Sequence, residues 1–375
     1  MIQIFAPYIE KEELNAIKEV FDSAWLGLGP KTAEFEKRFA EYIGVKFAVG
    51  VNSCTAALDL SLKLLNVGKN DEVIVPTMTF VSTAHAVVYN QAMPVFADIN
   101  EKTLSIDLDD VRKKITAHTK AIIPVHYSGR AVDMDALKKI AKNIPIIEDA
   151  AHACGAEYKG KKCGSLGDIG CFSFHAVKNL TMGDGGALTL NDKAMAERAK
   201  RLRWLGIDKG TWDRTKVDKS YWWEYFVDEI GFKCHMNDIA AAIGLVQLKK
   251  LDSMNNKRRE IIKTYNRAFK DIDWIETPPE DDINYKSSWH IYCIKVKNRV
   301  NRDDLGIYLQ SKGIATGLHY KPIHLYSCYK QNVSLPKAEK IFKRILTLPL
   351  HPRLKNQDVE KIIYAIKKFD IHVKR

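Results

Sequence analysis

The sequence predicts an α/β fold built on a mostly parallel β-sheet with helices on both faces. Two observations predict it: short apolar runs recur through residues 1–250, and amphipathic segments with helical spacing separate several of them. Parallel strands need such crossover helices, and those helices cover both faces of the sheet. Ligands bind beyond the carboxyl ends of strands in these sheets. Polar residues that follow a predicted strand are therefore the first candidates for a functional site.

The elements follow from periodicity along the chain. The predicted strands are residues 72–75, 94–99, 121–126, 145–149, 171–175 and 187–190, with helices at 56–65 and 134–141. A long helix is expected at 237–254 and a separate one at 257–270, followed by a strand at 288–296 and helices at 303–312 and 358–369. Residues 209–224, polar with three tryptophans, are expected to form a long loop near a pocket or interface. The change of pattern near Leu251 predicts a large domain (residues 1–250) and a smaller C-terminal α/β domain (251–375).

Composition excludes several classes of protein. With 46% apolar and 28% charged residues, the 375-residue chain matches ordinary globular proteins. No apolar run approaches the roughly 20 residues that span a membrane, and the first residues lack the pattern of a signal peptide. The seven scattered cysteines indicate a reducing cytoplasm, and they argue against disulfides, a zinc site or an iron–sulfur cluster.

The net charge of +12 is unevenly distributed. Residues 1–250 contain 33 Lys+Arg and 32 Asp+Glu, whereas residues 251–375 contain 25 and 14. A basic chain suggests nucleic acid as one possible partner. Solvated helix faces can also account for a surplus of positive charge in the C-terminal part. Some of this charge can attract a small anionic substrate.

Residues 52–58 (NSCTAAL) begin a predicted helix directly after the apolar run 47–51. Small polar residues at a helix N-terminus leave backbone N–H groups and hydroxyls free to bind phosphate. The alternative is an ordinary N-cap, formed by Asn52 or Ser53. Taken alone, this segment predicts either a phosphate site or a simple helix start.

Residues 146–152 (IIEDAAH) place Asp149 at the end of an apolar strand and His152 three residues later. A carboxylate there can pair with a protonated ring nitrogen, and the histidine can hydrogen-bond the same ligand. Alternatively, Asp149 caps the next segment and His152 packs against the sheet.

Residues 171–186 (CFSFHAVKNLTMGDGG) contain Lys178, which has few charged neighbours in the sequence. A partly desolvated lysine has a lowered pKa and can act as the nucleophile that forms a Schiff base. The alternative is a surface lysine in a loop. A phosphate site, a carboxylate for a pyridinium nitrogen and a Schiff-base lysine together favour pyridoxal 5′-phosphate (PLP) as the cofactor.

The chain also resembles the DegT/StrS family of fold-type-I, PLP-dependent nucleotide-sugar aminotransferases over nearly its whole length. The segments that carry the resemblance are 25–30 (WLGLGP), 52–58, 71–80 (DEVIVPTMTF), 124–129 (PVHYSG), 148–152, 164–168 (GSLGD), 173–186, 319–320 (HY) and 348–352 (LPLHP). The resemblance implies a PLP-binding large domain, a small domain that closes the site, and a homodimer with shared active sites.

The resemblance also implies roles for individual residues. Lys178 is expected to bind PLP covalently and to move the proton, Asp149 to hold the pyridine nitrogen protonated, and His152 to lie near the 3-hydroxyl. Phe80 matches the aromatic residue that stacks on the ring, although it could also be a core residue. The positions that match the phosphate contacts are Cys54, Thr55 and Ser173.

The sequence departs from the family pattern in residues 231–238, which match the segment that reaches the partner's phosphate. Lys233 replaces a usual asparagine and His235 a usual arginine, so either could supply that contact, or both could be solvated. His85 also replaces a common asparagine on the substrate side.

The substrate contacts implied by the resemblance are Trp25, Tyr320 and His324. Each could instead be an ordinary loop residue. His319 and His324 lie five residues apart with no obvious acidic partner, so no metal site is expected there.

The resemblance implies transfer of an amino group from glutamate to a nucleotide-diphospho-keto-deoxysugar. Residues 222–238 favour amination at C4 over C3. One rival is a PLP-dependent sugar dehydratase, but those relatives replace the Schiff-base lysine with histidine, whereas this chain keeps Lys178. A second rival, a regulatory or nucleic-acid-binding protein, is disfavoured because no helix-turn-helix signature competes with the full-length resemblance. Neither a nucleic-acid nor a membrane partner is expected.

Overall fold

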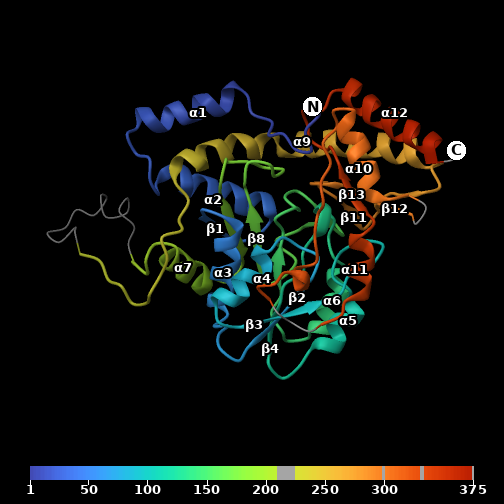
Figure 1. Ribbon diagram of the computed structural model, residues 1–375. Coiled ribbons are helices and arrows are strands. Elements are labelled where there is room, and N and C mark those ends of the chain that lie inside the picture. The colour runs from blue at the N-terminus through green and yellow to red at the C-terminus, as the bar shows by residue number, and fades with distance from the viewer. Residues whose placement is uncertain (209–223, 298–299, 330–332, 374–375) are drawn as a thin grey trace.

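The computed structural model describes residues 1–208, 224–297, 300–329 and 333–373 (Figure 1). The strands of the central sheet are β1 (Phe47–Val51), β2 (Glu72–Pro76), β3 (Met93–Ala97), β4 (Thr119–Ile122), β5 (Ile147–Asp149), β8 (Ile169–Ser173) and β9 (Gly186–Leu190). The six predicted strands are all present, with ends shifted by a few residues. The loop expected at 209–224 lies, except for its last residue, outside the described residues.

The strands form a mixed sheet in which one strand is reversed. Two hydrogen-bonded sets, β1-β9-β8-β5 and β3-β2-β4, are joined by parallel bridges from Ile122 to Ile146 and from Val125 to Asp149. Strand β2 is parallel to β3 and β4, and β5 is parallel to β8, whereas β9 is antiparallel to both β8 and β1. The mostly parallel sheet is thereby confirmed. The carboxyl ends of β1, β5 and β8 lie at one edge, where β9 begins.

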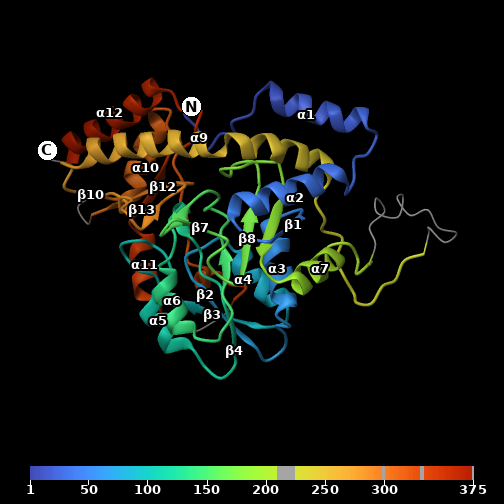
Figure 2. The same ribbon diagram turned by 180° about the vertical axis from the view of Figure 1, so that it is seen from behind.

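Helices cover both faces of this sheet, as predicted (Figure 2). The helices of this part are α1 (Lys11–Asp22), α2 (Pro30–Ile43), α3 (Cys54–Leu64), α4 (Ser82–Tyr89), α5 (Leu108–Lys114), α6 (Met134–Ala141) and α7 (Lys193–Leu202). Alternate strand residues point to opposite faces. Val49 and Cys171 therefore pack with α3, α4 and α7, whereas Ala48 and Phe172 pack with α2 and α6.

One continuous helix, α9 (Asp238–Phe269), replaces the two helices expected at 237–254 and 257–270. The polar residues near 255 suggested a break, but their side chains are used in tertiary contacts. Asn255, 1% exposed, donates to the carbonyl of Cys154 and accepts from Asn179, so it does not cap a helix end. The expectation of two helices was wrong because these partners cannot be seen from local sequence.

The C-terminal part has its own small sheet and core. Its elements are β10 (Ile275–Glu276), β12 (Tyr292–Val296), α10 (Arg302–Ser311), α11 (Pro336–Phe342), β13 (Ile345–Leu348) and α12 (Asn356–Val373), with β10-β12-β13 forming one sheet. A small sheet of β6 (Glu157–Tyr158), β7 (Lys161–Lys162) and β11 (Tyr285–Lys286) pairs this part with the large one. A buried cluster around Trp274, Tyr292 and Leu309 forms the core.

Helix α9 connects the two parts. It passes from beside α1 and α2 to α12, so the proposed boundary at Leu251 lies inside a helix (Figures 1 and 2). Asp238 is the first residue of α9, and its carboxylate accepts hydrogen bonds from the N–H groups of Gly29, Lys31 and Thr32 at the start of α2. Within the described residues, no helix is both long and apolar enough to cross a membrane.

Candidate active site

Lys178 lies in the connection between β8 and β9, at the edge of the sheet where ligands are expected. Its Nζ atom is 3.4 Å from Nε2 of His290, a residue that precedes β12. Burial lowers the pKa of Lys178 to about 8, although the charges of Cys54 and Asp149 act in the opposite direction. Near neutral pH a useful fraction of this lysine is therefore unprotonated and nucleophilic.

Asp149 is the last residue of β5 and is 4% exposed. Its Oδ2 accepts a 2.8 Å hydrogen bond from Thr83 Oγ1, and its Oδ1 accepts one from the Ala151 N–H. Burial raises the pKa of Asp149, because a low-dielectric site penalises the carboxylate. A protonated ring nitrogen would supply the missing positive charge.

His152 and two aromatic side chains form one wall of the site. Tyr320 OH lies 2.9 Å from His152 Nε2, and the two rings stack at 5.9 Å. Phe80 is exposed and its ring lies 6.1 Å from that of Tyr320. His152 Nδ1 is buried without a hydrogen-bond partner among the described residues, and burial lowers the pKa of the ring well below its usual range. This neutral nitrogen is free to bind a ligand hydroxyl.

The start of α3 lies next to the C-terminal end of β8 and the first residue of β9. Ser53 caps the helix by accepting from the Ala56 N–H, and Thr55 Oγ1 lies 2.8 Å from Ser82 Oγ. Cys54 is buried, and burial raises its thiol pKa, so the thiol stays protonated. Ser173 and Val51 both pair with Gly186. The residues predicted from the sequence to hold phosphate are therefore neighbours at one helix N-terminus.

Gly186 allows this close approach, and we expect its replacement by alanine to disturb the site. A Cβ atom there would lie 2.4 Å from the Ser53 carbonyl carbon and 2.7 Å from the Cys54 nitrogen. We expect Gly186→Ala to lower the free energy of unfolding by about 1–3 kcal/mol and to weaken PLP binding. Denaturant titration and PLP titration measure both effects. Gly68→Ala, where nothing lies within 4 Å, is the control; equal behaviour of the two variants would contradict the prediction.

The lowered pKa of Lys178 predicts a pH dependence for PLP uptake by the cofactor-free protein. The neutral amine attacks the aldehyde, so the rate should rise through pH 8 and level off above about pH 9. A lysine with the ordinary pKa of about 10.4 would keep gaining rate beyond pH 10. Stopped-flow absorbance measures the rate, and a profile still rising at pH 10 would refute the assigned pKa.

His235 and Lys233 lie beside the start of α3 in their own chain. The ring of His235 meets that of Trp204 edge-on at 4.3 Å, and Lys233 Nζ lies 3.4 Å from the centre of the Trp204 ring. Burial lowers the pKa of His235 to about 4. The cross-subunit phosphate contact stays a prediction for either residue.

The remaining predicted residues have partners of their own. His324 is buried, with Nδ1 2.6 Å from Thr77 Oγ1 and Nε2 3.2 Å from Glu339 Oε1, so both ring nitrogens are engaged. Trp25 Nε1 donates to the Leu28 carbonyl, in the loop that precedes α2. His85 stacks on the ring of Tyr329. Of the three residues expected to contact the substrate, the structure places Tyr320 beside His152 in the candidate site.

The sequence analysis did not single out two residues that contact the candidate catalytic groups. Thr83 fixes the Asp149 carboxylate, and its position three residues after Phe80 was an available signal. His290, next to Lys178, belongs to the C-terminal part and carries no local motif.

A buried group of possible metal ligands, His126, Glu148 and Cys163, lies behind Asp149. The Glu148 oxygens accept hydrogen bonds from the N–H groups of Gly164, Leu166 and Gly167, and His126 Nε2 lies 2.8 Å from Glu148 Oε2. His126 Nδ1 accepts from the Val132 N–H. These bonds occupy the lone pairs that a metal would need, so the group functions as a network that fixes the end of β5.

The residues at this edge fit PLP. The unpartnered nitrogen of His152 could bind the ring hydroxyl of PLP. The buried carboxylate of Asp149 could accept the pyridinium N–H, and the start of α3 could bind the phosphate. The fold and the site together define a fold-type-I, PLP-dependent enzyme. A family profile matches residues 7–367, and the chain belongs to the DegT/DnrJ/EryC1/StrS aminotransferase family.

Individual relatives agree with this assignment. The chain is 37% identical over 372 residues to dTDP-4-dehydro-2,3,6-trideoxy-D-glucose 4-aminotransferase of Saccharopolyspora spinosa, covering 98% of this chain and 96% of that one. The aminotransferase TlmJ of Streptoalloteichus hindustanus has a TM-score of 0.94 and 38% identity, over 100% of both chains. A Streptococcus pneumoniae protein described as a sugar aminotransferase, solved in a PMP form, has a TM-score of 0.94 and 34% identity, again over 100% of both chains. The protein is a sugar aminotransferase that uses PLP.

Proposed function

We propose that the protein transfers the amino group of glutamate to C4 of a nucleotide-diphospho-4-keto-6-deoxyhexose. The observation that carries the transfer chemistry is the buried Lys178, which has a lowered pKa and whose Nζ atom lies 3.4 Å from His290 Nε2. The name of the Saccharopolyspora spinosa relative, a 4-aminotransferase of a dTDP-linked keto sugar, supports the substrate class and the C4 position.

The chain's own residues divide the work of this transfer. PLP, when bound, supplies an electron sink for the changes at the carbon–nitrogen bond. Asp149 keeps the ring nitrogen protonated, and His152 orients the ring through its free Nδ1. Lys178 Nζ moves the proton at the reacting carbon. Over both halves of the reaction, glutamate becomes 2-oxoglutarate, and the sugar's keto group becomes an amine.

We propose that the working form is a homodimer. Phe226, Val227 and Ile230 are exposed, Ile230 to 93%, in the stretch just before residues 231–238. Exposed apolar groups of this kind are suited to a protein–protein interface. Sedimentation at micromolar concentration should show a dimer, and a monomer at every concentration would refute this assembly.

The function is tested with a panel of keto sugars. UDP-, GDP- and dTDP-linked 3-keto and 4-keto sugars are incubated with glutamate, and NMR of the product identifies the aminated carbon. We expect a 4-amino product. A 3-amino product would establish the C3 alternative, and loss of water without amination would establish the dehydratase. The Lys178→Ala variant is the background control.

A further inference from the structure

His152 lies where the large part of the molecule meets the C-terminal part. It follows β5 in the large part, whereas two side chains that pack against its ring, Tyr320 and His290, belong to the C-terminal part. The ring of His152 lies 5.9 Å from that of Tyr320, at an angle of 24°, and 4.4 Å from that of His290. The Ser288 hydroxyl also donates to the His152 carbonyl. Residues that are distant in the sequence therefore form much of the surroundings of His152.

Tyr320 is held in position by the segment around it. Gly317 and Thr347 of β13 exchange backbone hydrogen bonds, and His319 Nδ1 lies 2.9 Å from Thr347 Oγ1. The Tyr127 hydroxyl donates to the His319 carbonyl. The Tyr320 hydroxyl lies 2.9 Å from His152 Nε2 and has no other hydrogen-bond partner among the residues that the structure describes. This contact with His152 is the hydrogen bond that the Tyr320 hydroxyl can make in the described part of the chain.

The direction of this hydrogen bond follows from counting donors and acceptors. A neutral imidazole has one N–H and one acceptor nitrogen, and burial keeps His152 neutral by lowering its pKa well below the usual range. Burial also raises the pKa of Tyr320, so the hydroxyl keeps its proton. If His152 Nε2 carried the hydrogen, both the tyrosine O–H and the buried Nδ1 atom would be left unpaired. If the tyrosine donates instead, only the N–H of Nδ1 is unpaired, which costs less free energy.

An N–H group at His152 Nδ1 is suited to an oxygen atom of the cofactor. Nδ1 is buried, lacks a partner within the described chain, and is the atom assigned above to the ring hydroxyl of PLP. With its hydrogen on Nδ1, His152 can donate to this oxygen in the ionised form, and such charge-assisted hydrogen bonds are stronger than neutral ones. With its hydrogen on Nε2, the same nitrogen could only accept from the protonated hydroxyl.

We propose that Tyr320 is a positioning residue whose hydroxyl donates to His152 Nε2 and so holds the histidine hydrogen on Nδ1, where it binds the ring oxygen of PLP. The proposal rests on the part of the proposed function in which His152 orients the ring, and it does not depend on which sugar is aminated. Because Tyr320 belongs to the C-terminal part, the hydrogen bonding of the cofactor ring depends on the position of that part.

Two ligands without an aldehyde separate this role from packing. Pyridoxine 5′-phosphate carries the ring hydroxyl but cannot form a Schiff base with Lys178, and its 3-deoxy analogue lacks only that hydroxyl. Calorimetry with the cofactor-free protein measures both dissociation constants. For Tyr320→Phe, which keeps the aromatic ring, we expect pyridoxine 5′-phosphate to bind about three- to tenfold more weakly, because one hydrogen bond is lost. The 3-deoxy analogue should bind as tightly as it binds the wild-type protein.

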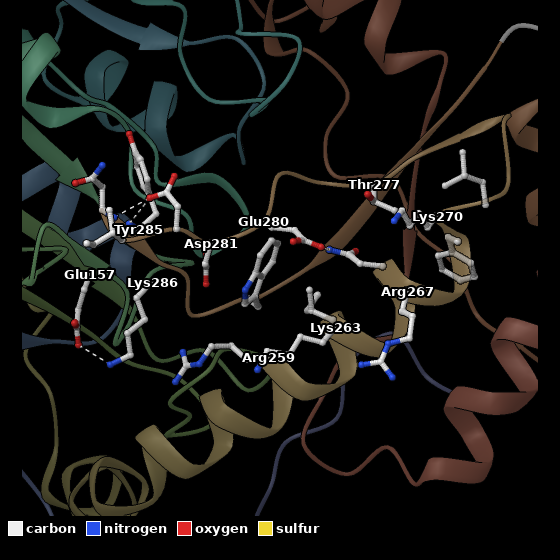
Figure 3. A pocket seen from close by; sticks show the side chains of 18 of the residues that line it. Glu157, Arg259, Lys263, Arg267, Lys270, Thr277, Glu280, Asp281, Tyr285 and Lys286 are labelled. Carbon is white, nitrogen blue, oxygen red and sulfur yellow. Dashed lines mark hydrogen bonds and ion pairs between the residues drawn. The ribbon is translucent and has the colours of Figure 1, made fainter.

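Tyr285→Phe is the matched control, because it removes one tyrosine hydroxyl elsewhere in the C-terminal part. Tyr285, on β11, lines a separate cavity of about 1120 Å³ together with Arg259 and Lys263 of α9 (Figure 3). Neither Lys178 nor His152 is among the described residues that line this cavity. We expect Tyr285→Phe to leave the affinity for both ligands unchanged.

Nitrogen NMR of protein labelled with ¹⁵N-histidine tests the tautomer directly. With pyridoxine 5′-phosphate bound to the wild-type protein, we expect the His152 hydrogen on Nδ1, and the His152→Gln variant identifies the signal by its loss. In Tyr320→Phe, part of the population should carry the hydrogen on Nε2. The wild-type measurement needs no variant of Tyr320, so it tests the proposal even if Tyr320→Phe does not fold.

Several outcomes would overturn the proposal. One is a wild-type His152 that carries its hydrogen on Nε2. Another is an equal loss of affinity for both ligands in Tyr320→Phe, which would indicate a packing role, and unchanged binding of pyridoxine 5′-phosphate in that variant would count equally against it. Equal binding of the two ligands by the wild-type protein would refute the contact between His152 and the ring hydroxyl, and the proposal with it. A failure of the proposed sugar substrate looks different, because keto sugars would remain unaminated while the expected binding results held.

Discussion

Replacing Lys178 by alanine should lower the rate of amino transfer by at least about 10³-fold. In the proposed mechanism the side chain is needed twice, as the nucleophile that would hold the cofactor and as the group that would move the proton. Its lowered pKa suits both tasks, because an amine near pKa 8 can take up and release a proton around neutral pH. Single-turnover absorbance with glutamate measures the effect.

The same variant should also lose covalent attachment of the cofactor. Borohydride treatment of the wild-type protein should fix PLP on Lys178, as shown by mass spectrometry of the peptide, and Lys178→Ala should remain unlabelled. Lys193→Ala, which removes an exposed lysine at the start of α7, is the control and should keep full activity. A Lys178→Ala protein that still transaminates would eliminate the assigned mechanism.

Replacing Asp149 by asparagine should reduce turnover by about 10²–10³-fold. Asparagine keeps the size of the side chain and can still accept from Thr83, so the fold should persist. It lacks the negative charge that holds the ring nitrogen protonated, and the cofactor then becomes a poorer electron sink. Both half-reactions should slow to a similar extent, because the ring nitrogen takes part in each of them.

The control for Asp149→Asn is Asp184→Asn. Asp184 is an exposed carboxylate in the glycine-rich turn between Lys178 and β9. We expect the Asp184→Asn variant to leave turnover unchanged. If Asp149→Asn retained wild-type rates in both halves, the ring nitrogen would not need its carboxylate, and the assignment of Asp149 would be wrong.

Strand positions could be predicted from the sequence because buried parallel strands are short and uniformly apolar. The same pattern predicted that Asp149 ends a strand and that Lys178 follows one, and the structure has Asp149 as the last residue of β5 and Lys178 in the connection after β8. The single helix α9 could not be predicted from the sequence. The local pattern near Asn255 indicates a helix end, but in the structure Asn255 hydrogen-bonds to Cys154 and Asn179 instead.

The residues that lie next to Lys178 in the fold cannot be predicted from the local sequence pattern. His290 is 112 positions from Lys178. Arg258 lies in a run of ordinary helix charges, NNKRRE, in which nothing separates it from Arg259. Only the folded structure shows that Arg259 donates to the Ser287 carbonyl, whereas Arg258 is buried and its Nε and Nη1 atoms have no hydrogen-bond partner among the described residues. Burial of a charged side chain is a tertiary property, so it leaves no signature in the residues alongside it.

The continuity of α9 has a mechanical consequence. At 1.5 Å per residue, its 32 residues make a rod about 48 Å long that belongs to both parts of the molecule. A sharp hinge at Leu251 would break consecutive backbone hydrogen bonds, so any movement of the small part relative to the large part would require α9 to bend gradually along its length. Asp238, at the N-terminal end of α9, accepts hydrogen bonds from residues at the start of α2, so bending of α9 would also shift the loop that precedes α2. Trp25 lies in that loop, so a bend of α9 would also move this side chain.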